Sequence, residues 1–479
     1  MSVEIARTSA IAASMLIAFV VAGVCTDAHA ETYRVTDIGV PPGYTSSLAL
    51  AINNAGQVAG VCHNAGGSHA LRHTPADGVN PAVLEDLGTF ENGSYSVAFG
   101  INEAGHVSGD SDTQNAEPRG FAWQGAALVD IVGGNGGANI HAFDLNDAGR
   151  IVGRMTNSGS GNPAKFRAIL WEEDPDRPGR YIQTTLSVLP GGDPAFSFSD
   201  AQAINSLGQI AGESFISDGT SNHAVIWDND SAHTIIDLPR LAGAGASLVF
   251  DINDAGQVVG ESYFPFVGSH ATLWGPEPDH EAVDLGTLPG HVHSHAEAIN
   301  ASGIAVGTST ADSSATERGV VFLNGRAWDL TALLDPSESG WTIISAQDIN
   351  DAGQIAATAR RNGSAHAVVL TPVTTTAVGD DAPPAGGKIA ALGPNFPNPF
   401  RDATALSFTL ARPAPVSLTV HDAAGRLVAR IAEGARAAGE HVVEWNGRDA
   451  SAGRLASGTY FIRLETPGET LLRRVTIVR

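Results

Sequence analysis

The sequence contains almost no cysteine. Only Cys25 and Cys62 occur among its 479 residues, and we expect Cys25 to be lost with a leader segment. The mature chain of roughly 450 residues could then form no internal disulfide, so its stability must come from a hydrophobic core. Cys62 follows a strand-like run, where a lone cysteine is more often a small buried hydrophobe than a nucleophile.

Positive charge is also scarce. The chain has 27 Lys and Arg against 51 Asp and Glu, a net charge of −24. Such a surface repels phosphate, which argues against nucleic acid as a partner. The imbalance is confined to residues 31–390, with 15 basic and 41 acidic residues, whereas residues 391–479 have 11 and 8. This change of sign, beside the stretch DDAPPAGG at 380–387, predicts a linker over residues 376–393.

Only one apolar run approaches the length of a membrane span. It covers residues 11–24, after the short segment MSVEIAR, and precedes the cleavage signal AHA at 28–30. That order predicts a secretory signal peptide over residues 1–30. A lipoprotein would have a small residue before its cysteine, and this chain has Val24 before Cys25, so no lipid anchor is expected. The mature chain should therefore be exported and carry no transmembrane segment.

Linear motifs of catalysis are missing as well. There is no GxSxG, no P-loop and no convincing pair of carboxylates for glycoside hydrolysis. The run Asp110-Ser111-Asp112 resembles the start of a calcium loop but lacks the glycine and the distal glutamate. We therefore assign no catalytic residue and expect no cofactor.

One ten-residue unit, in contrast, occurs seven times. Its copies include AINNAGQVAG at 51–60 and DINDAGQVVG at 251–260, and the spacings between them are 44 to 59 residues. The shared asparagines are Asn53, Asn102, Asn146, Asn205, Asn253, Asn300 and Asn350. A glycine three residues further on suits a turn that needs positive φ. Seven copies at this period indicate a repeat architecture.

Each repeat contains four strand-like segments. An alternating strand ends at Ile-Asn, a short strand returns after the turn, and a strand such as HAVIW at 223–227 and a DLG-type strand follow. Four strands in about 45–50 residues make one blade of a β-propeller. The seventh repeat lacks a DLG-type strand, but YRVTDIG at 33–39 precedes the first repeat and can fill that place. We therefore predict an all-β protein with a seven-bladed β-propeller over residues 31–375, closed by its own N-terminal strand.

These repeats resemble the HAF repeats of bacterial extracellular proteins. The resemblance covers residues 33–373 and is carried by the INxxG hairpin, the HAxxW strand and the DLGTL strand, with DLGTLPG at 284–290 as the best match. It implies an exported protein. The family carries no agreed biochemical activity, so the resemblance indicates location better than function.

The third strand of each repeat begins with a planar nitrogen donor. The residues at this position are His69, His223, His270, His366, Arg119, Arg167 and Arg318. We expect each to tie a buried carbonyl or one of the aspartates before Ile-Asn, Asp144, Asp251 and Asp348, into its blade. The tryptophans on the same strand, Trp123, Trp171, Trp227 and Trp274, should pack between blades and are less suited to be sugar platforms.

Three alternating histidines, His291, His293 and His295, form the main metal-site candidate. Residues two apart share one face of a strand, and three imidazoles could hold zinc. The other repeats have unrelated residues five and seven positions before the asparagine, so the histidines belong to one blade and not to the scaffold. Solvent-exposed histidines are the alternative, which we favour because the triplet follows a Pro-Gly turn at one rim. A catalytic metal is expected least, since no acidic HExxH-like partner accompanies the histidines.

Residues 394–479 have a different pattern. Alternating segments such as ATALSFTL at 403–410, PVSLTVHD at 415–422 and GTYFIRLE at 458–465 predict about seven short strands in a small β-sandwich. The motifs FPNPF and GEHVVEWNGRDASAGRLASGTYFIRL resemble the Ig-like domain of the hook-capping protein FlgD and the type A sorting domain of the type IX secretion system. The resemblance implies delivery to, or attachment at, the outer cell surface, where a sorting domain would be cleaved and an Ig-like domain kept.

Two hypotheses of function remain. The first is an exported or cell-surface protein whose propeller binds an unknown extracellular ligand, protein or glycan, over its channel. The second is an extracellular polysaccharide hydrolase or lyase with a site over the same channel. A cluster of Asp, Glu, His and Arg at one channel mouth would favour the enzyme, and an apolar or uniformly acidic mouth would favour binding.

Overall fold

A computed structural model describes residues 32–373 and 390–477, apart from residues 78, 114–117, 133–138, 158–164, 192–197, 216–221, 312–316, 324, 397–399, 401–403, 411, 422–425, 438, 450–452 and 468. The predicted signal peptide, residues 1–30, and residues 376–389 of the predicted linker lie outside this part. The chain divides after Thr375 into two compact units. None of the described segments is a helix with the length and apolar character of a membrane span.

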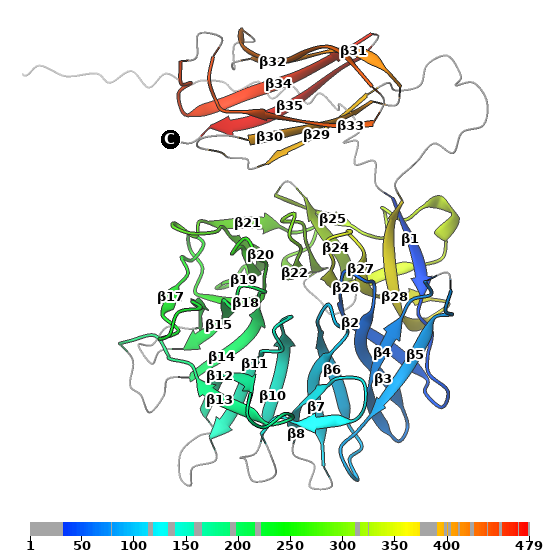
Figure 1. Ribbon diagram of the computed structural model, residues 1–479. Coiled ribbons are helices and arrows are strands. Elements are labelled where there is room, and N and C mark those ends of the chain that lie inside the picture. The colour runs from blue at the N-terminus through cyan, green and yellow to red at the C-terminus, as the bar shows by residue number, and fades with distance from the viewer. Residues whose placement is uncertain are drawn as a thin grey trace, which may run out of the picture. The chain divides into compact units, whose positions relative to one another are not determined.

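The first unit consists of seven four-stranded antiparallel sheets arranged in a ring, which we call blades 1 to 7 in chain order (Figure 1). Blade 1 contains β2 (Ser46–Ile52), β3 (Val58–Asn64), β4 (Gly67–Thr74) and β5 (Val83–Gly88). Blade 2 contains β6 (Ser96–Ile101), β7 (Val107–Asp112), β8 (Pro118–Trp123) and β9 (Leu128–Asp130). Blade 3 contains β10 (Ile140–Leu145), β11 (Ile151–Asn157), β12 (Lys165–Glu173) and β13 (Tyr181–Thr185).

The remaining blades repeat this order. Blade 4 contains β14 (Phe198–Ile204), β15 (Ile210–Phe215), β16 (Asn222–Trp227) and β17 (Ile235–Asp237). Blade 5 contains β18 (Ala246–Ile252), β19 (Val258–Phe264), β20 (Gly268–Trp274) and β21 (Ala282–Gly286). Blade 6 contains β22 (His293–Ile299), β23 (Ala305–Thr310), β24 (Glu317–Leu323) and β25 (Arg326–Asp329). Blade 7 contains β26 (Thr342–Ile349), β27 (Ile355–Arg361), β28 (Ser364–Val373) and the first strand of the chain, β1 (Thr32–Asp37), and a short 3₁₀ helix, η1 (Pro336–Glu338), precedes it.

The ring is closed by β1, as the strand count predicts. This strand pairs antiparallel with β28 from Thr32 opposite Val373 to Asp37 opposite Val368, and in Figure 1 the blue strand lies beside the yellow one. Tyr33 anchors it, with 3% of its surface exposed. The seven-bladed propeller predicted from the repeats is confirmed.

The apolar residues of neighbouring blades pack against each other. Between blades 1 and 2, for example, Ala51 and Ala70 meet Val107 and Phe121 in one buried cluster. The four tryptophans of the third strands are at most 4% exposed, which confirms that they are packing residues. Burial of each such side chain stabilises the fold by about 3 kcal/mol. One buried apolar cluster lies between each pair of neighbouring blades, so the core is distributed over the seven seams.

A β-bulge two to three residues before the asparagine bends the first strand of every blade. Six blades place a glycine of the second strand against it, and a Cβ on Gly260 would lie 2.0 Å from the carbonyl oxygen of Leu248. Blade 7 has Ala357 instead, and its first strand carries a second bulge between Ile343 and Ser345. We attribute the space for the Ala357 side chain to this second bulge, because its extra residue changes the path of the backbone that faces Ala357.

The seven repeated asparagines form a closed ring of hydrogen bonds. Each Nδ2 donates to the backbone carbonyl of the asparagine in the next blade, and the last bond runs from Asn350 back to Asn53 at 3.0 Å. Each Oδ1 accepts the N–H group four residues later, which holds the turn. The asparagines are 3–6% exposed, so an unpaired amide there would be costly. The turn glycines have φ between 72° and 84°, as expected.

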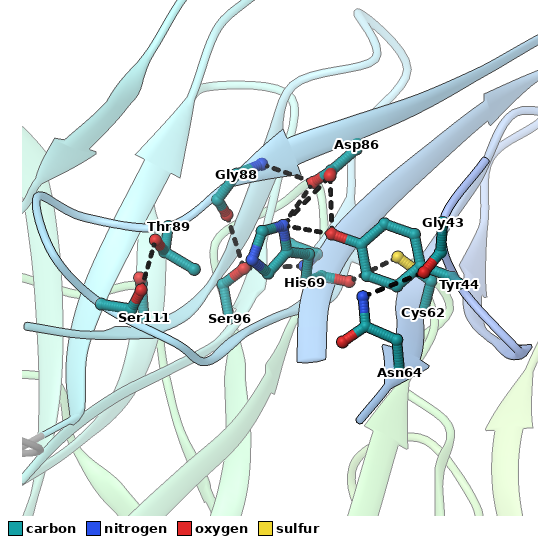
Figure 2. A network of polar contacts seen from close by, with 12 residues as sticks. Gly43, Tyr44, Cys62, Asn64, His69, Asp86, Gly88, Thr89, Ser96 and Ser111 are labelled. Carbon is teal, nitrogen blue, oxygen red and sulfur yellow. Dashed lines mark hydrogen bonds and ion pairs between the residues drawn. The ribbon is translucent and has the colours of Figure 1, made fainter. Parts of the chain in front are cut away.

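Six of the seven histidines and arginines near the start of the third strands pair with aspartates of the fourth strands, and Arg167 donates to the carbonyl of Phe166 at 2.9 Å. Four of the six are histidines, and in blade 1 the Nδ1 atom of His69 lies 2.9 Å from Asp86 (Figure 2). Tyr44 completes this network by donating to Asp86 at 2.7 Å. Arg119 and Arg318 pair with the equivalent aspartates. Our prediction of the aspartates before Ile-Asn as partners was wrong, because the third strand is next to the fourth and separated from the first by the second.

The second unit is a β-sandwich. One sheet has the order β29 (Ala390–Phe396), β30 (Thr404–Leu410) and β33 (Gly439–Trp445). The other has the order β32 (Leu427–Arg436), β31 (Ala414–His421), β34 (Gly458–Thr466) and β35 (Glu469–Ile477). Leu406 and Phe408 of one sheet and Leu418 and Ile462 of the other share one buried core. The seven strands confirm the predicted sandwich, and its first strand begins at Ala390, ahead of the expected start at residue 394.

Candidate functional site

The first strands of the seven blades line the propeller channel. Each of them contacts the first strands of both neighbouring blades, so that β2, β6, β10, β14, β18, β22 and β26 form the innermost ring. All seven end at the asparagine ring. The residues that follow the asparagines therefore surround one mouth of the channel, which we call the turn mouth.

The turn mouth is acidic. Its seven positions are Asn54, Glu103, Asp147, Ser206, Asp254, Ala301 and Asp351, all of them exposed. Four are carboxylates and none is basic. The mouth is therefore acidic at four of seven positions, closer to the acidic mouth expected of a binding propeller than to the mixed Asp, Glu, His and Arg cluster expected of an enzyme. These carboxylates come from the variable position directly after the asparagine.

Neighbouring blades fix these carboxylates. The N–H group of Asn54 donates to Glu103 at 3.0 Å, that of Ser206 to Asp254 at 2.9 Å, and that of Ala301 to Asp351 at 2.9 Å. Each carboxylate keeps acceptor capacity after these bonds. A pocket of about 180 Å³ opens here, lined by residues of blades 1, 2, 5, 6 and 7. Its carboxylates are therefore held ready before any ligand arrives.

A second set of carboxylates lies one step deeper. Asp144, Asp251 and Asp348 stand immediately before Ile-Asn or Leu-Asn in blades 3, 5 and 7, where the other four blades have Ala or Gly. Each joins two blades: Asp348 accepts the N–H group of its own neighbour Ile349 and that of Ile52 in blade 1, both at 2.7 Å. Asp144 and Asp251 make the same pair of bonds to their own and the next blade.

The environment of these three aspartates favours their neutral form. Burial raises the pKa of Asp144 to about 7, of Asp251 to about 6 and of Asp348 to about 8, although backbone N–H bonds oppose the shift. The charge of Asp251 adds to the rise at the other two. These groups are half-buried blade connectors, and they gain protons within the physiological pH range.

Charged residues also gather further along the inner strands, at the seams of blades 2, 3 and 4. His141 of β10 bonds through Nδ1 to the buried Asp110 of β7. Arg154 of β11 donates to Asp200 of β14 at 2.8 Å, and Asp200 is 7% exposed. Burial raises the pKa of both aspartates, and the interactions with His141 and Arg154 oppose that rise. We call His141, Asp110, Arg154, Asp200 and Glu213 the seam cluster.

Glu213 is the third acid of the seam cluster. It lies opposite Asp200 in the β14–β15 pairing, so the two side chains share one face of the sheet. Burial, and next the charge of Asp200, raise the pKa of Glu213 to about 8, while Asn222 donates to it at 3.1 Å. Two carboxyl groups with raised pKa thus stand beside each other, and the guanidinium of Arg154 holds one of them, Asp200.

The three alternating histidines have separate partners. β22 begins at His293, so His291 lies in the turn before it, where its Nδ1 is 3.0 Å from the hydroxyl of Ser309. His293 accepts the N–H group of Ser269 at 3.1 Å, and His295 pairs with Glu297 at 3.2 Å. All three are half-buried. Within the described residues no three His, Cys, Asp or Glu side chains assemble as metal ligands.

Sequence analysis identified the repeated structural residues of this region but not the seam cluster. The asparagines, the turn glycines and the tryptophans were recognised because they repeat. The seam cluster was missed because its members do not repeat: His141 and Asp200 hold a position that varies freely among the copies. Cys62 is free and fully buried, as expected of a small hydrophobe.

Comparison with known proteins matches the C-terminal unit to a family. The FlgD Ig-like domain matches residues 397–468. A search of curated proteins found no relative of the chain. The match agrees with the resemblance read from the motifs of this unit and with its sandwich fold.

Among solved structures, PorZ, a bacterial surface component of the type-IX secretion system of Porphyromonas gingivalis, is 15% identical. The alignment covers 89% of this chain and 64% of PorZ with a TM-score of 0.32, so the chain spans less than two thirds of that protein. The β-propeller domain of the Trilobed protease from Pyrococcus furiosus is 11% identical over 61% of this chain and all of that domain, with a TM-score of 0.33. Likeness at this level says nothing about what the present chain binds.

Proposed function

We propose that this protein is an exported cell-surface binding protein whose propeller holds a positively charged ligand at the turn mouth. The observation that carries this is the set of exposed carboxylates Glu103, Asp147, Asp254 and Asp351, with no basic residue among the seven positions. Glu103, Asp254 and Asp351 line one pocket. Such a ring focuses negative potential over the channel and attracts cations. Because backbone N–H groups already hold the carboxylates, binding needs little reorganisation.

A short basic peptide tests this function. Fluorescence anisotropy with labelled trilysine amide should give saturable binding that weakens with salt, whereas a triglutamate peptide should not bind. The triple variant Glu103→Gln, Asp254→Asn, Asp351→Asn should lose at least about tenfold in affinity, and a matched triple variant of outlying acids, Asp77→Asn, Asp176→Asn and Glu338→Gln, should bind as before. Equal binding by both variants would refute the turn mouth as the site.

Export and surface attachment belong to the same proposal. The n-region and AHA signal of residues 1–30 support secretion, the HAF-like repeats are typical of extracellular proteins, and the FlgD Ig-like match supports a surface or sorting role for the C-terminal unit. Intact-mass spectrometry of the protein from its native cell surface or medium tests this. A mass beginning at Glu31 supports export, and its other end distinguishes a cleaved sorting domain, near residue 390, from a retained module ending at Arg479. A chain still beginning at Met1 would refute cleavage of the signal peptide.

A polysaccharide-acting enzyme is the second candidate, and the seam cluster favours it. Glu213, with its pKa raised to about 8, and the facing Asp200 offer the two carboxyl groups, one as general acid and one as base or nucleophile, that glycoside cleavage requires. Reducing-sugar release from a panel of extracellular polysaccharides should then be abolished by Glu213→Gln and by Asp200→Asn, with unchanged thermal stability. Absence of any release by the wild-type chain across the panel would remove this candidate.

A further inference from the structure

The fourth strand of blade 4 departs from the other blades at two adjacent positions. Blades 1 and 5 continue after the aspartate with Leu-Gly-Thr, at 87–89 and 285–287, whereas blade 4 has Leu238-Pro239-Arg240. The residue two after the aspartate normally donates its N–H group to that aspartate, at 2.7–3.0 Å in five blades. Proline has no N–H group, so Asp237 lacks this bond.

A pocket of about 430 Å³ opens beside this strand. His223, Asp237, Pro239 and Arg240 of blade 4 line it, together with Asp279 from the loop between β20 and β21 of blade 5. The volume lies within the usual range of small-molecule sites. The pocket thus sits at a seam between two blades, on the third and fourth strands and away from the innermost ring.

Two nitrogen atoms of this pocket are buried and have no hydrogen-bond partner among the described residues. They are Nε2 of His223 and Nη2 of Arg240. His223 is oriented by Asp237, whose carboxylate oxygens lie 3.1 and 3.2 Å from its Nδ1. The other three histidines at this position show no such orphaned atom. Buried polar atoms are normally satisfied, so these two point to a ligand that satisfies them.

The walls of the pocket are fixed in place. The indole N–H of Trp274, which is fully buried, donates to the carbonyl of Pro239 at 2.7 Å across the blade seam. Leu238 is buried beneath the strand. A ligand would therefore meet a preformed polar pocket with a small apolar wall of Leu238 and Pro239.

The chemistry of these groups selects the class of ligand. Arg240 can only donate, Asp237 lacks a donor, and Nε2 of His223 accepts when Nδ1 carries the proton that faces Asp237. A phosphate or carboxylate would meet the charges of Asp237 and Asp279, and an ammonium group would meet Arg240. Adjacent hydroxyl groups donate and accept without charge and satisfy all three. We propose that this pocket binds a neutral saccharide unit, a site independent of the turn mouth.

Isothermal titration of the full-length protein with the methyl glycosides of glucose, galactose, mannose, fucose and N-acetylglucosamine tests the site. At least one should bind, and the double variant Pro239→Gly, Arg240→Thr should weaken it at least about tenfold, because it removes the charged donor. That variant restores the Gly-Thr of blades 1 and 5 and should unfold at the wild-type temperature. Arg360→Thr, which removes an exposed arginine elsewhere, should bind as the wild type does.

Three results would overturn the site. They are no binding by any glycoside, glycoside binding unchanged in the double variant, and phosphate or glycylglycine binding that is tighter than glycoside binding and is lost in that variant. None of these outcomes bears on trilysine binding at the turn mouth, so the two proposals fail separately.

Discussion

Two positions on the same strand of each blade behave in opposite ways. The asparagine that ends the first strand is identical in all seven blades and makes the same bonds in each. The residue five positions earlier is Leu48, Val97, His141, Asp200, Leu248, His295 or Ser345. The asparagine closes the ring through a hydrogen bond that is made between every pair of neighbouring blades. The residue five positions earlier packs between blades whose side chains differ from seam to seam, so a charged residue can occur there.

This contrast separates scaffold from chemistry. The asparagine ring, the bulge glycines and the His–Asp pairs recur because each solves a backbone or seam problem that is present in every blade. The seam cluster, the turn-mouth acids and the Pro-Arg pair of blade 4 occur at positions where the residue type differs among the blades. Repeated residues therefore predict stability effects, and departures from the repeat predict sites.

The bulge glycine gives the strongest test of the scaffold. Gly260→Ala would put a Cβ 2.0 Å from the carbonyl oxygen of Leu248, so the backbone must move, and we expect a loss of about 3 kcal/mol. Ala357→Gly in blade 7 should cost only about 1 kcal/mol, from chain entropy. Urea denaturation followed by circular dichroism measures both. Similar losses in the two variants would contradict the role given to the second bulge.

Breaking the asparagine ring should have the next largest effect. Asn205→Ala removes the bond to Asn253 and leaves the N–H group of Gln209 without its acceptor, so the free energy of unfolding should fall by about 2 kcal/mol. The adjacent Ser206→Ala removes only the exposed bond from the Ser206 hydroxyl to Asp254 and should cost about 0.5 kcal/mol or less. The same denaturation assay compares them, and a larger loss for Ser206 would contradict the ring.

The connecting aspartates should make stability depend on pH. The pKa of Asp348 is about 8 in the folded protein, so between its unfolded value near 4 and 8 the folded state holds a proton that the unfolded chain has released. Rising pH through that window therefore lowers the free energy of unfolding. We expect the unfolding temperature to drop between pH 5 and pH 8.

Asp348→Asn should reduce this drop, because an amide does not titrate. Asp351→Asn, three residues away on the exposed turn mouth, is the matched control and should leave the slope unchanged. Scanning fluorimetry across the pH range distinguishes the two. An unaltered slope in Asp348→Asn would mean that other groups dominate the pH dependence.

The smallest effect concerns the one His–Asp pair that carries a tyrosine. Tyr44→Phe removes the hydroxyl that donates to Asp86 beside His69 (Figure 2), and should cost about 1 kcal/mol. The His–Asp pairs of blades 4, 5 and 7 have no such tyrosine in the described contacts, so this pair forms in those blades without a tyrosine hydroxyl. A change below the error of denaturation would show that the hydroxyl is replaced by water at no cost.

Much of the fold could be predicted because it repeats. Seven asparagines at a regular period, and one strand too many at the front, imply seven blades and their closure by β1. The partner of His69 could not be predicted in the same way, since pairing across strands depends on which strands are neighbours. The sequence alone also placed no weight on His141 or Asp200, because a single charged residue among seven copies looks like drift until its seam partner is known.

The pocket of blade 4 shows what signal was available. Pro239 and Arg240 interrupt a motif that is Gly-Thr in two other blades, and that departure is visible in the sequence. Its meaning depends on geometry: the lost N–H bond to Asp237 and the orphaned nitrogen of His223 appear only when the strands are assembled. Departures from a repeat are therefore the residues to examine first.

The most direct test of the proposed function is a crystal structure of the full-length protein with trilysine amide. We predict ammonium groups within hydrogen-bond distance of Asp254 and Asp351 at the turn mouth. A peptide bound instead along the seam cluster, or on the outer strands with the turn mouth vacant, would contradict the assignment of this mouth as the binding site.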